Sequence, residues 1–360
     1  MTPERHVDIP LASSHFLMYR TLKWTDACFS EAMPPRLWNG VDNPTPISTS
    51  LELERALRRS VREACADGRA ALALSGGIDS AVLARFMPEG SVAYTFRCRV
   101  PGREVVDESA RAVSYANACG LEHRIVDITW EDMEGLAPAL MCRKGAPIHS
   151  IEVQIAKASR VAREDGFERL IFGETADVNY GGLTGVLAHE WSFGEFVDRF
   201  AYLKPYMVLQ DPRLPLEPFR EHMRADGTID VHEHLRNIDI FESVGSYVNA
   251  TEWGGVDLVC PYLETRLAVP LDYERVRRGE SKYLIREIFE REYPGWKIPA
   301  KIPMPRPTDE WFANWRGPVR PEFLPGCVRG LTGDQRWLVW ALERFLDLVD
   351  SEGAGPGSLG

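Results

Sequence analysis

Apolar and polar positions alternate with two different periods along this chain, beginning near residue 50. From Ser50 onward, apolar residues recur at helical spacing until Gly68 interrupts the pattern. With Ser50 as the N-cap, this spacing predicts an amphipathic helix. Its apolar stripe consists of Leu53, Leu57, Val61 and Ala64. Residues 1–50 contain one strand-like stretch, His15–Arg20, and are otherwise rich in proline and short polar clusters, so we expect an arm packed on the main domain.

Strand and helix patterns then alternate as far as residue 172. The predicted strands are residues 70–75, 91–97, 123–128 and 168–172, and the predicted helices are 79–87, 107–119 and 150–164. The strands are short apolar runs with many β-branched residues, which is typical of strands buried on both faces. Repeated strand–helix units of this kind predict an α/β fold, in which helices cover both faces of a parallel twisted sheet.

Beyond residue 183 the strand pattern fades, and helical periods joined by proline-rich loops replace it. Helices are expected at Trp191–Leu203, Leu216–Met223, Val231–Val248 and Ser281–Glu292. We therefore predict a helical C-terminal region after the α/β part. The expected divisions are the arm at 1–50, the α/β part at 51–183, the mainly helical part at 184–352 and a disordered low-complexity tail at 353–360.

Composition limits the partners of the chain. Its 360 residues carry a formal net charge of −11, which argues against nucleic acid as the main partner because that binding depends on basic side chains. No apolar run reaches the ~18 residues of a membrane span, so no membrane association is expected. The first residues lack the apolar core of a signal peptide. The seven cysteines are scattered without a Cys-x-x-Cys pair, so we expect reduced thiols and a cytoplasmic protein.

The strongest chemical signal lies where the first predicted strand ends, in Ser75-Gly-Gly-Ile-Asp-Ser80. Gly76 and Gly77 lack a Cβ, so their backbone amides can approach an anion closely. The hydroxyls of Ser75 and Ser80 add donors, and a helix beginning at Asp79 would direct its positive dipole end to the same point. The carboxylate of Asp79 repels phosphate unless a cation such as Mg²⁺ lies between them. The loop therefore predicts a nucleotide pyrophosphate bound with Mg²⁺, although it lacks the usual P-loop spacing.

A second loop with glycines and carboxylates, Gly173–Gly182, follows the last predicted strand. Acidic residues in such a loop are also common as helix caps, so the carboxylates by themselves do not establish a site. Both loops nevertheless follow the carboxyl ends of predicted parallel strands, where ligands bind in open α/β sheets. We therefore predict that Asp79 and Asp177 hold one Mg²⁺ from opposite sides, with Gly173 and Glu174 beside the same ligand.

These two loops resemble the signatures of the asparagine synthetase family, which also includes the β-lactam and carbapenam synthetases. Ser75–Ser80 is similar to the family's pyrophosphate loop, and Gly173–Val178 is similar to its Gly-Glu-Gly-x-Asp-Glu signature. The resemblance extends from about Ser13 to Trp311. It also includes Val106–Arg111 with Leu121–His123, Val256–Glu264 and Ser281–Arg286.

The resemblance implies an adenine nucleotide alpha-hydrolase-like (PP-loop) fold and an ATP- and Mg²⁺-dependent reaction. ATP would transfer AMP to a carboxylic acid, pyrophosphate would leave with Mg²⁺, and ammonia or an amine would attack the acyl-adenylate to give an amide. The family's glutamine-using members begin with a glutaminase domain whose catalytic cysteine follows Met1, whereas residue 2 here is Thr. Nitrogen is therefore expected from free ammonia, a separate glutaminase or a larger amine, and a carrier protein is a further candidate partner.

Individual residues inherit expected roles from the resemblance. Glu174 occupies the position where asparagine synthetases carry a glutamate and the β-lactam-forming relatives a tyrosine, which favours proton transfer from an external amine. Asp257 occupies the position of a supporting glutamate in the cyclising relatives, and Glu264 is its alternative. Leu74, Thr95 and Phe96 are expected to meet adenine, mainly through backbone groups.

The resemblance also implies a catalytic cation from a basic segment near residue 300. Lys301 lies where the family has a basic segment with an essential lysine, but the segment here is rich in proline. Lys297 and Arg306 therefore remain alternatives. The altered segment also leaves open a non-catalytic partner subunit of an amidotransferase, and the pyrophosphate loop alone would suit a tRNA-modifying or sulfur-transfer enzyme. An amide synthetase of specialised metabolism is the favoured interpretation.

Overall fold

A five-stranded parallel sheet forms the centre of the computed structural model, which describes residues 5–300 and 304–353. The strand order is β6 (Glu122–Ile128), β5 (Val92–Cys98), β4 (Ala70–Ala73), β7 (Arg169–Ile171) and β8 (Asp257–Val259). All four neighbouring pairs are parallel. The chain begins at the middle of the sheet with β4, adds β5 and β6 on one side, and then crosses to β7 and β8 on the other. The carboxyl ends of β4, β5 and β7 therefore meet at the same edge.

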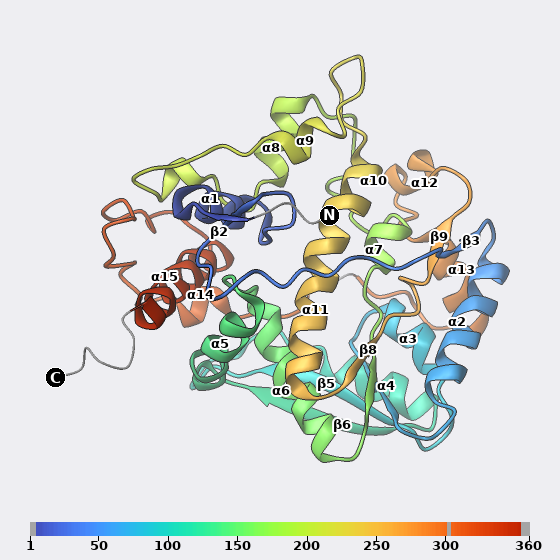
Figure 1. The fold of residues 1–360 in the computed structure, drawn as a ribbon. Coiled ribbons are helices and arrows are strands. Elements are labelled where there is room, and N and C mark those ends of the chain that lie inside the picture. The colour runs from blue at the N-terminus through green and yellow to red at the C-terminus, as the bar shows by residue number, and fades with distance from the viewer. Residues whose placement is uncertain (1–4, 301–303, 354–360) are drawn as a thin grey trace.

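Helices cover both faces of the sheet, as the alternating pattern predicts (Figure 1). Ala71 and Ala73 of β4 contribute to one apolar core, while Ala70 and Leu72 contribute to the other, because successive side chains of a strand point to opposite faces. The first core also contains α1 (Ile9–Tyr19), α5 (Trp130–Lys144), α6 (Ser150–Glu164) and α15 (Gly333–Gly353). The second contains α2 (Ser50–Ala64), α3 (Ile78–Ala84), α4 (Ser109–Ala118) and α13 (Tyr283–Glu292). The predicted α/β class with helices on both faces is confirmed.

The remaining elements form a layer around the carboxyl edge of the sheet. The helical elements are α7 (Ala176–Asn179), α8 (Phe193–Phe200), a 3₁₀ turn (Pro205–Met207), α9 (Glu217–Arg220), α10 (Val231–His234), a π-helical segment (Leu235–Asp239), α11 (Ile240–Gly254), α12 (Tyr273–Arg277) and α14 (Thr308–Trp311). A short parallel pair, β1 (His6–Val7) with β2 (Ala27–Cys28), forms within the N-terminal residues. A second, β3 (Thr45–Ile47) with β9 (Thr265–Leu267), joins the N-terminal residues to this layer. Figure 1 shows α11 as a long helix running through the middle of the molecule.

Two expectations about secondary structure are wrong. The strand-like stretch His15–Arg20 belongs to helix α1, which Asp8 caps by accepting a hydrogen bond from the Leu11 amide at 2.9 Å. Every residue from Ala12 to Tyr19 is buried, so the helix carries no polar stripe from which a helical period could be recognised. The strand pattern also does not end at residue 183, because β8 completes the sheet.

The structure contains helices that the sequence pattern did not predict, and the longest of these are α5 and α15. All seven cysteines are free thiols. Among the described residues, no helix combines the length and the apolar character needed to cross a bilayer. Residues 354–360 of the expected disordered tail lie outside the described residues. The proposed division of the chain into arm, α/β part and helical part stays a prediction.

Candidate active site

A pocket opens where β4, β5 and β7 end, and a segment near the C-terminus closes its far wall. That wall consists of Ser281, Lys282, Arg286 and residues 298–300 and 304–305. All the predicted nucleotide-binding residues except Gly76 line the pocket, together with Glu174. They are Leu74, Ser75, Gly77, Asp79, Ser80, Thr95, Phe96, Gly173 and Asp177. Phe172, Tyr247 and Met304 give part of the pocket an apolar surface.

The Ser75 loop is fixed by hydrogen bonds between its own residues. The Ser75 amide donates to Ser80 Oγ at 3.0 Å, the two hydroxyl oxygens lie 2.9 Å apart, and the Gly77 amide donates to Ser75 Oγ at 3.1 Å. Gly76 packs closely against a neighbouring helix, because a Cβ at this position would lie 3.0 Å from Glu108 Oε1. The loop therefore has a defined backbone conformation, and a side chain at Gly76 would have to displace Glu108 or Arg111.

The two predicted loops lie in direct contact. A Cβ on Gly173 would lie 3.1 Å from the Ser80 amide nitrogen and 3.2 Å from Asp79 Cβ, so only glycine allows this approach. The Tyr262 hydroxyl supports the same region by donating to the Asp79 carbonyl at 3.0 Å. The structure thus brings the Asp79 and Asp177 loops together at the carboxyl edge of the sheet, the position that the sequence predicts.

Lys282 lies between the two aspartates, a contact that the sequence did not predict. Its Nζ is 2.7 Å from Asp79 Oδ2 and 3.1 Å from Asp177 Oδ1, and its side chain is 9% exposed. Burial lowers the pKa of Lys282, but the two carboxylates outweigh burial and the net pKa is raised, so the ammonium stays charged. The backbone of Lys282 adopts a left-handed conformation with φ 53°, which costs about 1 kcal/mol for a residue with a Cβ.

Glu174 is held by two hydroxyl groups from helix α11. The Ser243 hydroxyl donates to Glu174 Oε1 at 2.6 Å, and the Tyr247 hydroxyl, one helical turn further on, is a second hydrogen-bond partner. Burial raises the pKa of Glu174, whereas the hydrogen bonds from Ser243, Tyr247 and the Thr175 amide oppose the rise. A carboxylate with a raised pKa that is oriented by fixed donors is suited to accept a proton.

Thr175 follows Glu174 in a left-handed conformation with φ 67°. The related signature has glycine at this position, which adopts positive φ without steric cost. The Thr175 side chain is 2% exposed, and its Oγ1 has no hydrogen-bond partner among the described residues. This residue therefore carries local strain beside the carboxylate that it helps to place.

Leu74, Thr95 and Phe96 line the part of the pocket nearest the ends of β4 and β5. The Thr95 hydroxyl donates to the Leu74 carbonyl at 2.7 Å and lies 2.7 Å from His123 Nε2. The Leu74 amide donates to the Tyr94 carbonyl at 2.8 Å. The Leu74 carbonyl and amide are thus already engaged within the protein. The expectation that these three residues meet adenine stays a prediction.

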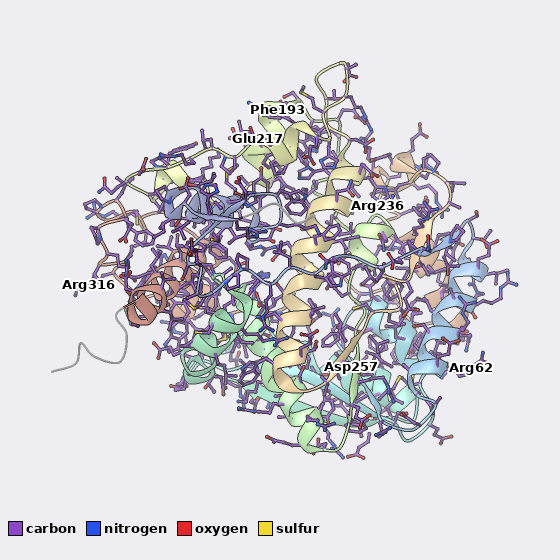
Figure 2. All side chains as sticks on the ribbon, viewed as in Figure 1. Arg62, Phe193, Glu217, Arg236, Asp257 and Arg316 are labelled. Atoms are coloured by element: carbon purple, nitrogen blue, oxygen red, sulfur yellow. The ribbon has the colours of Figure 1, made fainter. Side chains whose placement is uncertain are left out.

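The structure does not bring Asp257 to the pocket. Asp257 begins β8, and its amide donates to the Glu168 carbonyl at 2.8 Å beside the start of β7 (Figure 2). Its side chain is exposed at the amino ends of the strands, whereas the pocket lies at their carboxyl ends. The resemblance placed Asp257 at the site without indicating that it begins a strand, or which end of that strand would face the ligand. The alternative, Glu264, lies outside the pocket as well, in a separate hollow with Ser60 and Glu63.

Of the predicted catalytic cations, Lys297 and Arg306 do not line the pocket. Lys301 lies outside the described residues. Lys297 is exposed, and Arg306 pairs with Asp334, with Nη2 2.9 Å from Asp334 Oδ2. The cations that do line the pocket are Lys282 and Arg286. Both belong to the block Ser281–Arg286, which is part of the family resemblance. That resemblance was the available signal for these two cations, but it does not indicate what their side chains face.

Comparison with known proteins gives one family match. The model of the Asparagine synthase family matches residues 52–320. A search of curated proteins finds no match. Among solved structures, one similar protein is an NH₃-dependent NAD synthetase from Campylobacter jejuni subsp. jejuni NCTC 11168 in complex with the nitrate ion. Its sequence is 16% identical to this chain, and the TM-score is 0.24. That similarity covers 37% of this chain and 60% of the synthetase, which is less than two thirds of its length.

Two further solved structures are similarly distant. An NMN synthetase from Francisella tularensis is 14% identical, with a TM-score of 0.29, and the similarity covers 71% of this chain and 99% of that chain. A predicted subunit of tRNA methyltransferase from Methanocaldococcus jannaschii DSM is 13% identical, with a TM-score of 0.23, covering 64% of this chain and 93% of that chain. At these identities and TM-scores, none of the three similarities bears on the chemistry of the pocket.

Proposed function

Because the chain belongs to the asparagine synthase family, over residues 52–320, we propose that it is an amide synthetase that adenylates a carboxylic acid with ATP and transfers the acyl group to ammonia or an amine. The family assignment supports ATP-dependent amide ligation in general. The observation that carries the finer proposal is the arrangement of Lys282 between Asp79 and Asp177 at one side of the pocket, with Glu174 nearby in the same pocket. In this proposal, Lys282 and the two aspartates serve the phosphates, and Glu174 serves proton transfer, within one cavity.

In the proposed first step, the carboxylate of the substrate attacks the α-phosphorus of ATP, and the bond to pyrophosphate breaks. The leaving pyrophosphate gains negative charge, which fixed amide dipoles and cationic side chains can stabilise. The amides of the Ser75 loop supply such dipoles, and Lys282 and Arg286 supply the charge. Lys301 remains a proposed third cation, although it lies outside the described residues.

Asp79 and Asp177 fit a divalent cation because they are two carboxylates that already share one positive charge, the Lys282 ammonium. When bound, Mg²⁺ would neutralise charge on the phosphates of ATP and on the released pyrophosphate. The chain's own part is to present two carboxylates from separate loops and to keep Lys282 within reach of the phosphates. When nucleotide binds, the Lys282 ammonium would then change its ion-pair partner from the aspartates to a phosphate.

In the proposed second step, the amine nitrogen attacks the acyl carbon, AMP leaves, and the nitrogen loses a proton to Glu174. Ser243 and Tyr247 hold the Glu174 carboxylate in one orientation, while burial raises its pKa and so strengthens it as a base. Keeping a glutamate at this position supports transfer to an external amine. We further propose a small-molecule acid, nitrogen from ammonia, a separate glutaminase or a larger amine, and a cytoplasmic role in specialised metabolism.

The test is acid-dependent exchange of labelled pyrophosphate into ATP across a panel of carboxylic acids. Stimulation by an acid, lost in Asp79→Asn and Asp177→Asn, supports adenylation. Amide formation with ammonia that is lost in Glu174→Gln, while exchange persists, supports the second step. Absence of exchange with every acid, with Mg²⁺ and with candidate partner proteins present, would contradict the proposed function and favour a non-catalytic subunit.

A further inference from the structure

Helix α11 carries two polar faces, of which only one belongs to the pocket. Ser243 and Tyr247, four residues apart, contact Glu174. Glu242, Ser246 and Asn249, on the adjacent face, are each less than 10% exposed and contact a second cluster of buried charges. Any displacement of α11 at this cluster therefore also moves the two hydroxyl groups that hold Glu174.

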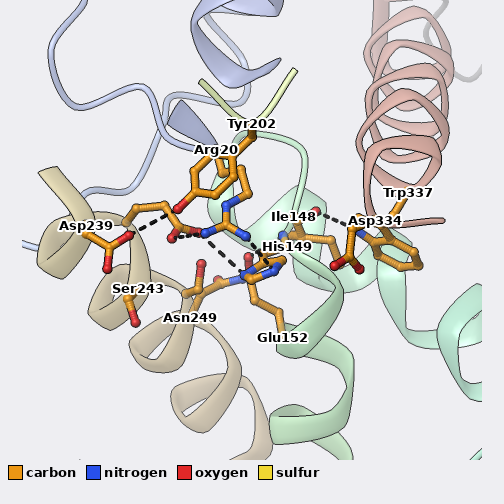
Figure 3. Close-up of polar contacts among 12 residues, drawn as sticks. Arg20, Ile148, His149, Glu152, Tyr202, Asp239, Ser243, Asn249, Asp334 and Trp337 are labelled. Atoms are coloured by element: carbon orange, nitrogen blue, oxygen red, sulfur yellow. Dashed lines mark hydrogen bonds and ion pairs between the residues drawn. The ribbon is translucent and has the colours of Figure 1, made fainter. Parts of the chain in front are cut away.

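Arg20, from the N-terminal arm, lies at the centre of this second cluster (Figure 3). Its Nη2 donates to Glu242 Oε2 at 2.8 Å, and its Nη1 lies 2.8 Å from His149 Nε2. The Arg20 guanidinium also covers the Tyr202 ring at 3.5 Å from the ring centroid, and the Tyr202 hydroxyl donates to Asp239 Oδ1 just before α11. Arg20 thus contacts α11 directly through Glu242 and indirectly through Tyr202.

The remaining members of the cluster connect α11 to α5 and α6. Lys144 Nζ lies 2.6 Å from Glu152 Oε1 and 3.3 Å from Ser246 Oγ, and Asn249 Nδ2 donates to Glu152 Oε2 at 2.8 Å. Glu152 also accepts from the His149 amide at 2.8 Å, which closes the first turn of α6. The cluster therefore joins the arm to three elements of the fold through charged and polar side chains.

The chemistry of His149 shows how specific the arrangement is. An arginine can only donate, so His149 Nε2 must accept from Arg20, and the neutral imidazole then carries its proton on Nδ1. Nδ1 faces Glu242 Oε1 at 3.6 Å, and neither atom has a hydrogen-bond partner among the described residues. Burial lowers the pKa of His149 and raises that of Glu242 to about 7. The fold thus keeps a costly buried charge pair at this place.

Backbone strain at Arg20 also indicates that the arrangement of this cluster is specific. Arg20 ends α1 in the left-handed region, with φ 57°, where a glycine is usual. This conformation costs about 1–2 kcal/mol for a residue with a side chain. In exchange, the guanidinium enters the cluster with 13% of the side chain exposed. A helix end that needed only to terminate would not require an arginine in this conformation.

We propose that Arg20, His149 and Glu242 form a positioning unit that sets α11, and with it Ser243 and Tyr247, against Glu174. The N-terminal arm thereby controls transfer to the amine without contributing to adenylation. This inference rests on the proposed function, because it assigns Glu174 to the second step. The three residues act through α11 and do not contact the pocket, so they are positioning residues rather than catalytic ones.

The experiment compares Arg20→Met and Glu242→Gln with Lys157→Met as the matched control. Lys157 also forms a half-buried ion pair between α6 and α5, with Nζ 2.6 Å from Asp132 Oδ2. Its ammonium also donates to the Asp127 carbonyl at 2.7 Å, and these partners belong to α5 and β6 rather than α11. Hydrogen exchange by mass spectrometry needs no substrate and is measured first. Faster exchange is expected in peptides covering 240–254 and 173–180 of the two test variants, and not in the control.

The half-reactions are then separated with the acid that the exchange assay identifies. Pyrophosphate exchange and trapping of the adenylate by hydroxylamine, an uncharged nucleophile at neutral pH, should stay within about twofold of the wild type. Transfer to ammonia should fall by about 10- to 100-fold, the range expected when a reacting group is misplaced. The loss should appear in kcat for transfer, with KM for ATP unchanged.

Three outcomes would overturn the positioning unit: wild-type transfer to ammonia in both variants, equal losses of exchange and transfer, or unchanged hydrogen exchange in α11. If the wild type itself shows no exchange with any acid, the proposed function fails. The hydrogen-exchange result still decides whether Arg20 and Glu242 hold α11 and the Glu174 loop. Failure of the positioning unit and failure of the proposed function are thus distinguishable.

Discussion

The Lys282 ammonium lies 2.7 Å from Asp79 Oδ2 and also contacts Asp177 at 3.1 Å, so the two carboxylates that we propose as Mg²⁺ ligands share one positive charge. Asp79 and Asp177 are 17% and 31% exposed, and their mutual repulsion is therefore only partly screened by solvent. Without nucleotide, Lys282 stabilises the loops. We propose that with nucleotide and metal bound, the same ammonium would become available to the phosphates.

Replacing Lys282 by methionine should therefore destabilise the protein and make its stability depend on divalent cations. Removing one partner of a largely buried ion pair costs about 3 kcal/mol or somewhat less where solvent reaches the carboxylates. Addition of Mg²⁺ or Mn²⁺ without nucleotide should restore much of this loss, because the metal takes over neutralisation. The measurement is the shift in unfolding temperature on titration with each metal.

Lys157→Met is the control for this change, since it removes another lysine–aspartate pair that does not line the pocket. Its unfolding temperature should not respond to metal, and that of the wild type should respond less than that of Lys282→Met. An equal response of all three proteins would show that the metal does not bind at Asp79 and Asp177.

The hydroxyl of Ser243 should determine the pH dependence of amide transfer. Burial raises the pKa of Glu174, so the base form, and with it the transfer rate, should increase as the pH rises through that raised value. Ser243 opposes the rise by donating to the charged carboxylate. Ser243→Ala should therefore shift the acidic limb of the rate profile towards higher pH by about one unit, which corresponds to ~1.4 kcal/mol of lost stabilisation.

The measurement is the ratio of transfer to pyrophosphate exchange between pH 5 and 9. Glu174→Gln is the reference, because it should lose the acidic limb itself while exchange persists. A shift of the limb towards lower pH in Ser243→Ala would contradict the assigned direction of the hydrogen bond.

Thr175→Gly should stabilise the fold. Thr175 has φ 67°, which costs a β-branched residue about 1–2 kcal/mol, and glycine avoids this cost but loses part of the gain through its greater freedom in the unfolded chain. The buried Thr175 Oγ1 without a partner adds to the gain on replacement. The free energy of unfolding should rise by about 1 kcal/mol, as measured by urea unfolding. Thr175→Ala keeps the positive φ and is the control, for which a smaller gain is expected.

In this chain, features that depend on neighbouring residues could be predicted from the sequence, whereas contacts between residues far apart in the sequence could not. The Ser75 and Gly173 loops were predicted because glycines and a carboxylate directly follow a strand, and that signal is local. Lys282 lies 203 residues from its partner Asp79, and Ser243 lies 69 residues from Glu174. No period or spacing encodes such contacts, because they depend on how α11 and α13 pack on the sheet.

The errors have equally physical causes. Helix α1 was mistaken for a strand because burial on all sides removes the polar stripe on which helix prediction depends. Asp257 was assigned to the site because a motif gives order along the chain, but not which end of a strand meets the ligand. The basic segment around Lys301 departs from the family pattern, and its role stays a prediction.

His234 should make the protein sensitive to acid, independently of the active site. Its ring lies among Phe196, Phe200 and Phe219, with centroids 4.7–5.0 Å away, and its Nε2 has no partner among the described residues. Burial, together with His222, lowers the pKa of His234 from 6.5 to about 3. The folded state therefore binds fewer protons than the unfolded state, so stability is complete above pH 6.5 and is lost as the pH falls towards 3.

Replacement of His234 by leucine removes this titration and should flatten the dependence of the unfolding free energy on pH. Below pH 6.5 the difference in slope should approach about 1.4 kcal/mol per pH unit. Glu242, whose pKa is raised to about 7, acts with the opposite sign, since its contribution is complete below pH 4.5 and is lost as the pH rises to 7. Both proteins contain Glu242, so subtracting the unfolding free energy of the wild type from that of His234→Leu at each pH cancels the Glu242 contribution. Urea unfolding from pH 4 to 8 gives the slope of the unfolding free energy against pH. The control is His189→Leu, because His189 is exposed. Equal slopes for all three proteins would contradict the assigned burial of His234.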